Sequence, residues 1–167
     1  MDLTPLLPVL KFVHVLAALA FLLAHGTSAA VSVRLRRERD RTRIIAYLQL
    51  SQWTMGASYV SLLVLFVGGI VSGIVGGYWT GGQWWLWVSL VLFIALAFEM
   101  SFVRWRFLLG VRTALGIAPP PKIGEAPPLG TDEELFAFLD SPLPFLNLAF
   151  ALAVIAILVW LMMFKPF

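Results

Sequence analysis

The fold is decided by a stretch near the N-terminus: residues 8–33 read PVLKFVHVLAALAFLLAHGTSAAVSV, whose only ionisable side chains are one lysine and two histidines. A helix rises about 1.5 Å per residue and the hydrocarbon layer of a bilayer is about 30 Å thick, so about 20 apolar residues cross it. Three further stretches meet this requirement, at residues 52–75, 84–107 and 142–164. The sequence therefore predicts an all-α protein, a four-transmembrane-helix bundle that forms a single domain over residues 1–167.

The composition of the whole chain agrees with a membrane protein. Hydrophobic residues make up 60% of the chain and charged residues 13%, whereas soluble domains carry about 45–50% and about 25%. The chain has no cysteine, which excludes disulfides, thiolate metal sites and cysteine nucleophiles. The sequence also lacks phosphate-binding loops, zinc-peptidase motifs and nucleophile elbows. These observations favour a protein that is not an enzyme.

Basic residues are concentrated on one side of the predicted membrane. Ten of them lie in the first loop, at the end of the third span and in the third loop, whereas Lys11 and Lys165 lie on the other side. Because basic loops stay in the cytoplasm, we expect both termini outside, in a bacterial inner membrane. Asp2 stands where a signal peptide would carry basic residues, so the first helix is expected to be retained. The orientation rule accounts for the arginine run, and no nucleic-acid partner is expected.

The third loop, residues 110–141, is the only sizeable segment outside the predicted spans. Its proline-rich part, residues 118–130, is expected to be extended and polyproline-like. Thr131 and Glu134 then form the pattern of a capping box in front of an apolar run at residues 135–139. We expect a short helix here that lies at the cytoplasmic interface.

Small residues form two stripes along the second span. Close approach of helix backbones over small residues favours association in lipid. The stripes therefore predict a packing face, either for another helix of this chain or for another subunit or copy. The alternative is the general abundance of glycine in membrane helices. The first stripe is Gly69, Gly73 and Gly77, and the second is Gly68, Ser72 and Gly76.

His14 and His25 are the candidate ligands for a cofactor such as haem b. They are eleven residues apart, so they share a face of one helix about 16 Å apart and cannot bind one metal together. Each would need a second ligand from a partner chain or from a methionine. The alternative is an imidazole hydrogen-bonded to a neighbouring helix. Lys11 lies one turn before His14 and could hold an anion at the outer interface. The methionines considered are Met55, Met100 and Met162.

Glu99 is a carboxylate inside the third predicted span. Ionisable groups at such a depth are costly and have a nearby partner or a function. We expect a structural ion pair with Arg106 or Arg34. The alternative is a proton or cofactor site that Glu99 shares with His25.

The stretch Leu10-Lys11-Phe12-Val13-His14-Val15-Leu16 resembles the K-x-x-H-v-l start of several small bacterial membrane families. These are the CopD-like copper-resistance proteins, a related uncharacterised four-helix family and the HemJ-type protoporphyrinogen oxidases. Residues 73–79 and 85–89 are similar to the turn between the second and third helices of the uncharacterised family. The HemJ-type resemblance implies a role for His14 in haem binding, although Val88 or Ser89 stands where that branch carries a lysine.

Three functions follow as expectations. The first is a non-catalytic accessory or structural subunit of a larger membrane complex, because few polar groups are buried and one chain does not complete a site. The second is a haem b-binding redox protein that uses His14. The third, which has the least support, is transport of copper or a small solute.

Overall fold

The computed structural model describes residues 3–118 and 126–166, and within these ranges its regular elements are all helices. The elements are η1 (Thr4–Leu6), α1 (Leu7–Leu35), α2 (Arg41–Val75), α3 (Trp84–Phe98), η2 (Glu99–Val103), α4 (Arg104–Ala114), α5 (Asp132–Leu139) and α6 (Leu143–Phe164). They form four rods that are long and apolar enough to cross a membrane. The prediction of an all-α, four-helix, multi-pass membrane protein is confirmed.

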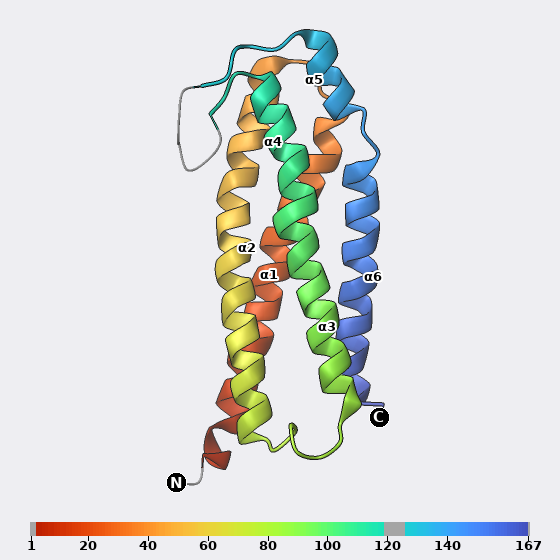
Figure 1. Ribbon diagram of the computed structural model, residues 1–167. Coiled ribbons are helices and arrows are strands. Elements are labelled where there is room, and N and C mark those ends of the chain that lie inside the picture. Colours follow the sequence, from red (N-terminus) through yellow and green to blue (C-terminus); the bar gives the residue numbers. More distant parts are fainter. Residues whose placement is uncertain (1–2, 119–125, 167) are drawn as a thin grey trace.

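The four rods run side by side (Figure 1), and the sequence places different side chains at the two ends of the bundle. One end, which we call the tryptophan-rich end, carries Trp79, Trp84, Trp85 and Trp87 in and after the turn between α2 and α3; the described chain also begins and ends there. The arginine-rich end carries the turn between α1 and α2, together with α5. α1 packs most closely on α2, and α3 packs on α6.

Two of the rods are longer than the sequence predicts. α2 starts at Arg41 instead of residue 52, because the Asp40 carboxylate caps it by accepting hydrogen bonds from the backbone N–H groups of Thr42 (2.8 Å) and Arg43 (3.1 Å). The third rod consists of α3, η2 and α4 and ends at Ala114; Gly116, which has a φ of +67°, follows the cap and stops the helix. Since α2 has 35 residues, it is about 52 Å long. The bundle therefore extends beyond the hydrocarbon layer at the arginine-rich end.

The short helix predicted in the third loop is present as α5. Thr131 and Glu134 form the capping box, with reciprocal bonds of 3.0 and 3.2 Å. Leu135 and Leu139 are fully buried in the protein, so α5 packs these apolar side chains on the end of the bundle. Gly110 of α4 allows this, because a Cβ there would lie 2.5 Å from the Phe138 ring. The proline-rich prediction falls largely on residues 119–125, outside the described ranges.

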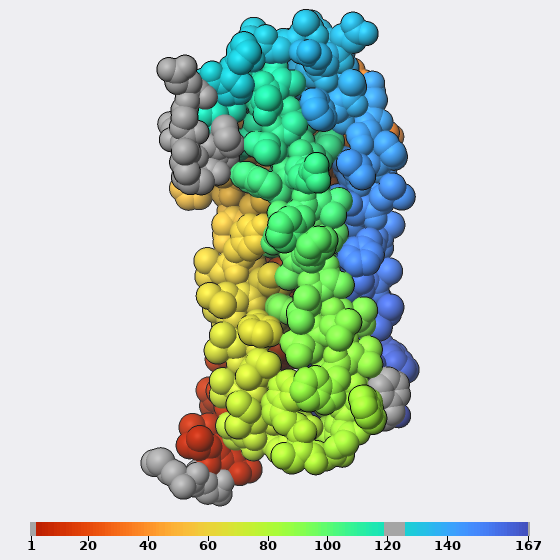
Figure 2. Space-filling model, viewed as in Figure 1, coloured from red at the N-terminus to blue at the C-terminus, as the bar shows by residue number. Residues whose placement is uncertain are grey.

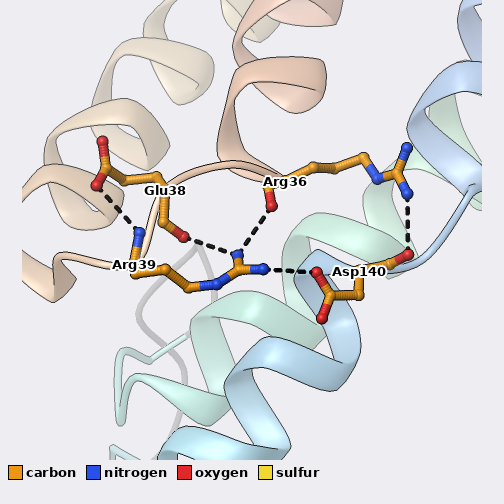
Figure 3. Close-up of polar contacts among 4 residues, drawn as sticks. All are labelled: Arg36, Glu38, Arg39 and Asp140. Atoms are coloured by element: carbon orange, nitrogen blue, oxygen red, sulfur yellow. Dashed lines mark hydrogen bonds and ion pairs between the residues drawn. The ribbon is translucent and has the colours of Figure 1, made fainter.

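Arginines of the first turn hold α5 in place (Figure 3). Arg39 donates to the Asp140 carboxylate (2.7 Å) and to the carbonyl oxygens of Arg36 (2.8 Å) and Glu38 (3.0 Å). Arg36 donates to the Asp140 carbonyl oxygen (3.0 Å). Backbone N–H groups of Asp40 and Arg39 donate to the Glu38 carboxylate, which lowers the pKa of Glu38.

Two buried apolar clusters fill the bundle. One lies in the middle of the rods and includes Phe21, Leu62, Leu96, Met100 and Val154. The second, which we call the arginine-end cluster, joins α1, α2, α4 and α5. Its members are Val31, Leu35, Ile44, Leu48, Met55, Phe107, Leu108, Val111, Ala114, Leu115, Leu135 and Leu139.

Candidate functional site

A buried polar cluster lies between α1, α2 and the third rod. Arg104 donates from Nη2 to Ser28 Oγ, and its Nη1 lies 3.2 Å from His25 Nδ1. Ser28 Oγ in turn lies 3.0 Å from Ser51 Oγ of α2. All four side chains are buried, so this chain of hydrogen bonds joins three helices inside the bundle. We define the buried polar cluster as His25, Ser28, Ser51, Glu99 and Arg104.

A π-helical turn, η2, places two of these side chains together. In an α-helix, residues five apart point about 140° away from each other. In η2 the backbone N–H of Arg104 bonds to the carbonyl oxygen of Glu99, which is the i to i+5 pattern of a π-helix. The wider turn brings Glu99 and Arg104 to the same side of the rod, where both are buried. Such turns are frequent at functional sites.

Glu99 does not form the ion pair that the sequence predicts. Among the described residues, neither of its carboxylate oxygens has a hydrogen-bond partner. Arg106 and Arg34 are both exposed, whereas the buried Arg104 lines the same small cavity as Glu99. The prediction was wrong because it assumed an unbroken α-helix, in which Arg106 shares a face with Glu99, whereas η2 rotates the residues that follow it.

Glu99 and His25 line one small cavity, together with Arg104 and with Asn147 of α6. Its volume is about 10 Å³, which is room for about one water-sized group. The His25 ring also stacks on Phe21, with the ring centroids 5.1 Å apart. The alternative of a shared Glu99 and His25 site therefore has a geometric basis, although the cavity is too small for a planar cofactor.

His14 lies in the other half of α1, in a separate environment. Its Nδ1 is 2.9 Å from the carbonyl oxygen of Leu65. Because a carbonyl oxygen only accepts, Nδ1 carries the proton of the neutral ring, and Nε2 keeps its lone pair. Lys11 lies 5.9 Å from the centroid of the Tyr78 ring, so it is placed at the tryptophan-rich end by a cation–π contact.

The small residues of α2 divide into two groups. Gly68 and Gly69 face His14, and a Cβ at position 69 would lie 3.0 Å from His14 Cε1. Farther along, Gly73 and Gly76 are covered by Trp79 and Tyr78, aromatic residues of the turn that follows α2. In the described structure, the nearest neighbours of the first group therefore belong to another helix, whereas those of the second group belong to the turn and to Ser72. Of the remaining predicted positions, Ser72 is buried and Gly77 has a φ of +68° in the turn.

The predicted methionine ligands are dispersed. Met55 belongs to the arginine-end cluster, Met100 belongs to the middle cluster, and Met162 is exposed on α6. In residues 3–118 and 126–166, no three His, Cys, Asp or Glu side chains come together as a metal site.

A groove of about 420 Å³ separates α2 from the third rod. In Figure 2 it lies between the yellow surface of α2 and the green surface of the third rod. α2 contributes Leu48, Ser51, Gln52, Met55, Gly56 and Tyr59, and the third rod contributes Ser101, Trp105, Leu108 and Arg112. Sequence reasoning missed Arg104 and Arg112, because both were assigned to the cytoplasmic boundary as orientation signals. The five-residue spacing of Glu99 and Arg104 predicts that the two side chains lie together only in a π-helical turn, and the sequence pattern does not reveal that turn.

No family model, curated protein or solved structure matches this chain. The function must therefore be inferred from the residues and contacts described above.

Proposed function

We propose that this protein is a non-catalytic accessory subunit of a larger membrane complex, with both termini outside the cytoplasm. The supporting observation is that His25, Ser28, Ser51 and Arg104 of the buried polar cluster form hydrogen bonds with one another across helices. In lipid, interhelical hydrogen bonds and small-residue contacts hold helices together. These groups serve to fix the bundle, which then presents a rigid apolar surface to neighbouring subunits.

The test is purification of the full chain in mild detergent, followed by native electrophoresis and site-specific photo-crosslinking. Trp53 of α2 is 82% exposed and is the first position for a crosslinker, because large aromatic side chains are enriched at interfaces. Leu23 of α1, 75% exposed, is the matched control on another rod. We expect a colourless chain that co-migrates with a larger complex and one discrete adduct from position 53. A monomer that gives no discrete adduct from position 53 would contradict the proposal.

A haem b-binding redox protein is the second candidate, and the geometry of His14 favours it. The bond between Nδ1 and the Leu65 carbonyl oxygen (2.9 Å) is of the kind that orients ligating histidines and leaves Nε2 for the iron. The second axial ligand would come from a partner subunit or a second copy. When bound, haem would supply one-electron chemistry.

Absorption spectra of variants test this second candidate. If His14 is an axial ligand, His14→Gln abolishes the Soret band, whereas His25→Gln retains it because His25 bonds to Arg104. A wild-type protein that has no chromophore when purified with its partners would refute haem binding.

A further inference from the structure

The groove between α2 and the third rod has polar ends and an apolar middle. At its arginine-rich end, Arg112 Nη2 donates to Gln52 Oε1 (3.0 Å) and to the Leu48 carbonyl oxygen (3.4 Å). At the other end, the Tyr59 hydroxyl lies 3.5 Å from Ser101 Oγ. Ser101 and Arg112 are eleven residues apart, so the groove is about 16 Å long.

The groove begins at the depth of lipid headgroups. Trp84 opens the third rod at the tryptophan-rich end, and tryptophan prefers the membrane interface. Arg112 is 28 residues farther along the same rod, or about 42 Å. A bilayer with its headgroups is about 40–45 Å thick. Arg112 therefore lies among the headgroups of the opposite leaflet, and the groove descends from there into hydrocarbon.

Arg112 is a buried cation whose bonds leave room for an anion. The side chain is 7% exposed, yet it lines the groove. Both of its hydrogen-bond partners in the described structure are neutral, and both bonds come from Nη2. A guanidinium has five N–H donors, so Arg112 retains donors for a further group. Burial of a charge is costly unless it is paired, and a phosphate pairs with arginine through two parallel bonds.

We propose that the groove binds one anionic phospholipid of the leaflet at the arginine-rich end. Its phosphate lies on Arg112, and one acyl chain extends over Met55, Gly56 and Leu108 toward Tyr59. The volume of about 420 Å³ falls in the usual range for small-molecule sites, about 300–1,000 Å³.

Native mass spectrometry of the full chain in detergent tests the proposal, with phosphatidylglycerol and phosphatidylcholine of identical acyl chains as probes and palmitate as a third. Arg112→Gln removes the charge, and Arg106→Gln, an exposed arginine of the same helix, is its control. Gly56→Leu fills the groove, since a Cβ at Gly56 meets no atom within 4 Å. Gly26→Leu is its control, because Gly26 on α1 has equal space.

We expect one phosphatidylglycerol to be retained in preference to phosphatidylcholine. A charge-assisted contact is typically strong enough that Arg112→Gln should weaken this binding by about tenfold or more. Gly56→Leu should abolish it, and both controls should bind as the wild type does. Equal retention of the two phospholipids, or wild-type binding by Gly56→Leu, would overturn the proposal. Retention of palmitate in place of phosphatidylglycerol would overturn the assignment to a phospholipid. Wild-type binding by Arg112→Gln would overturn the role of Arg112.

Discussion

Replacement of Arg104 by leucine should destabilise the bundle far more than replacement of Glu99. Arg104 is 3% exposed and bonds to His25 and Ser28 across the interface with α1. The Glu99 oxygens have no hydrogen-bond partner among the described residues. Arg104→Leu therefore breaks two bonds and leaves the carboxylate without its neighbouring cation, whereas Glu99→Leu leaves the bonds of Arg104 in place.

The magnitude follows from these contacts. Interhelical hydrogen bonds in membranes average about 0.6 kcal/mol, so the two bonds of Arg104 contribute about 1.2 kcal/mol. Removal of one member of a buried charge pair typically costs about 3–5 kcal/mol, because the other charge is left unpaired. Arg104→Leu meets this cost in full, since the Glu99 oxygens have no other partner among the described residues. After Glu99→Leu, the guanidinium of Arg104 keeps its hydrogen bonds to His25 and Ser28, which offset part of the cost. We expect Arg104→Leu to lower the free energy of unfolding by about 3–5 kcal/mol. The double variant Glu99→Leu/Arg104→Leu should recover about 2 kcal/mol of that loss, since only the bonds are then missing.

The assay is reversible unfolding in mixed micelles at increasing mole fraction of dodecyl sulfate, applied to the wild type, both single variants and the double variant. Arg106→Leu is the matched control, because Arg106 is exposed, and it should change stability by less than about 0.5 kcal/mol. If the double variant loses the sum of the two single losses, Glu99 and Arg104 are not coupled. If Arg104→Leu matches the control, the cluster does not hold the helices together.

Three further predictions concern other parts of the chain. Leu135→Ala removes a fully buried side chain and should lower the free energy of unfolding by about 2–5 kcal/mol. Proteolysis of α5 should then be faster than in the control Leu129→Ala, whose side chain is exposed; an unchanged rate of proteolysis would contradict the packing of α5. Gly69→Leu should lower thermal stability, because a Cβ there lies 3.0 Å from His14 Cε1, whereas Gly26→Leu should have little effect; equal stability of the two variants would refute the close approach of α1 and α2. The pKa of Glu38 is lowered from its ordinary value of 4.5, so the bonds that its carboxylate accepts are fully present above pH 4.5 and are lost as the pH falls through the folded-state pKa. An NMR titration of Glu38 should show the lowered pKa, and an ordinary pKa would count against the geometry of the turn.

Hydropathy predicted the four rods because crossing a membrane imposes a minimum apolar length. It did not predict where the rods end. Residues 41–51 contain polar residues and the last arginines of the run, so hydropathy places them in a loop, although Asp40 caps a helix there. The first turns of α2 are also held by packing of Ile44 and Leu48 in the arginine-end cluster, which the hydropathy of a single segment does not reveal.

The candidate site was less predictable than the fold. His14, His25 and Glu99 stood out because ionisable groups are rare inside spans. Their partners were not visible, because the π-helical turn at Glu99–Val103 leaves no mark in the hydropathy pattern. Arg104 therefore could not be distinguished from the arginines that mark the boundary.

Because the bundle extends beyond the hydrocarbon layer, one part of it is stabilised in lipid and the other part in water. Within lipid, burial of an apolar side chain exchanges one apolar environment for another and contributes little. The arginine-end cluster extends to the end of the bundle that leaves the hydrocarbon, where burial removes apolar surface from water and carries the heat-capacity change of ordinary protein folding. Urea weakens that kind of burial. It should therefore open this end, α5 first, while the lipid-embedded half stays folded, so the protein unfolds in two steps that respond to different denaturants.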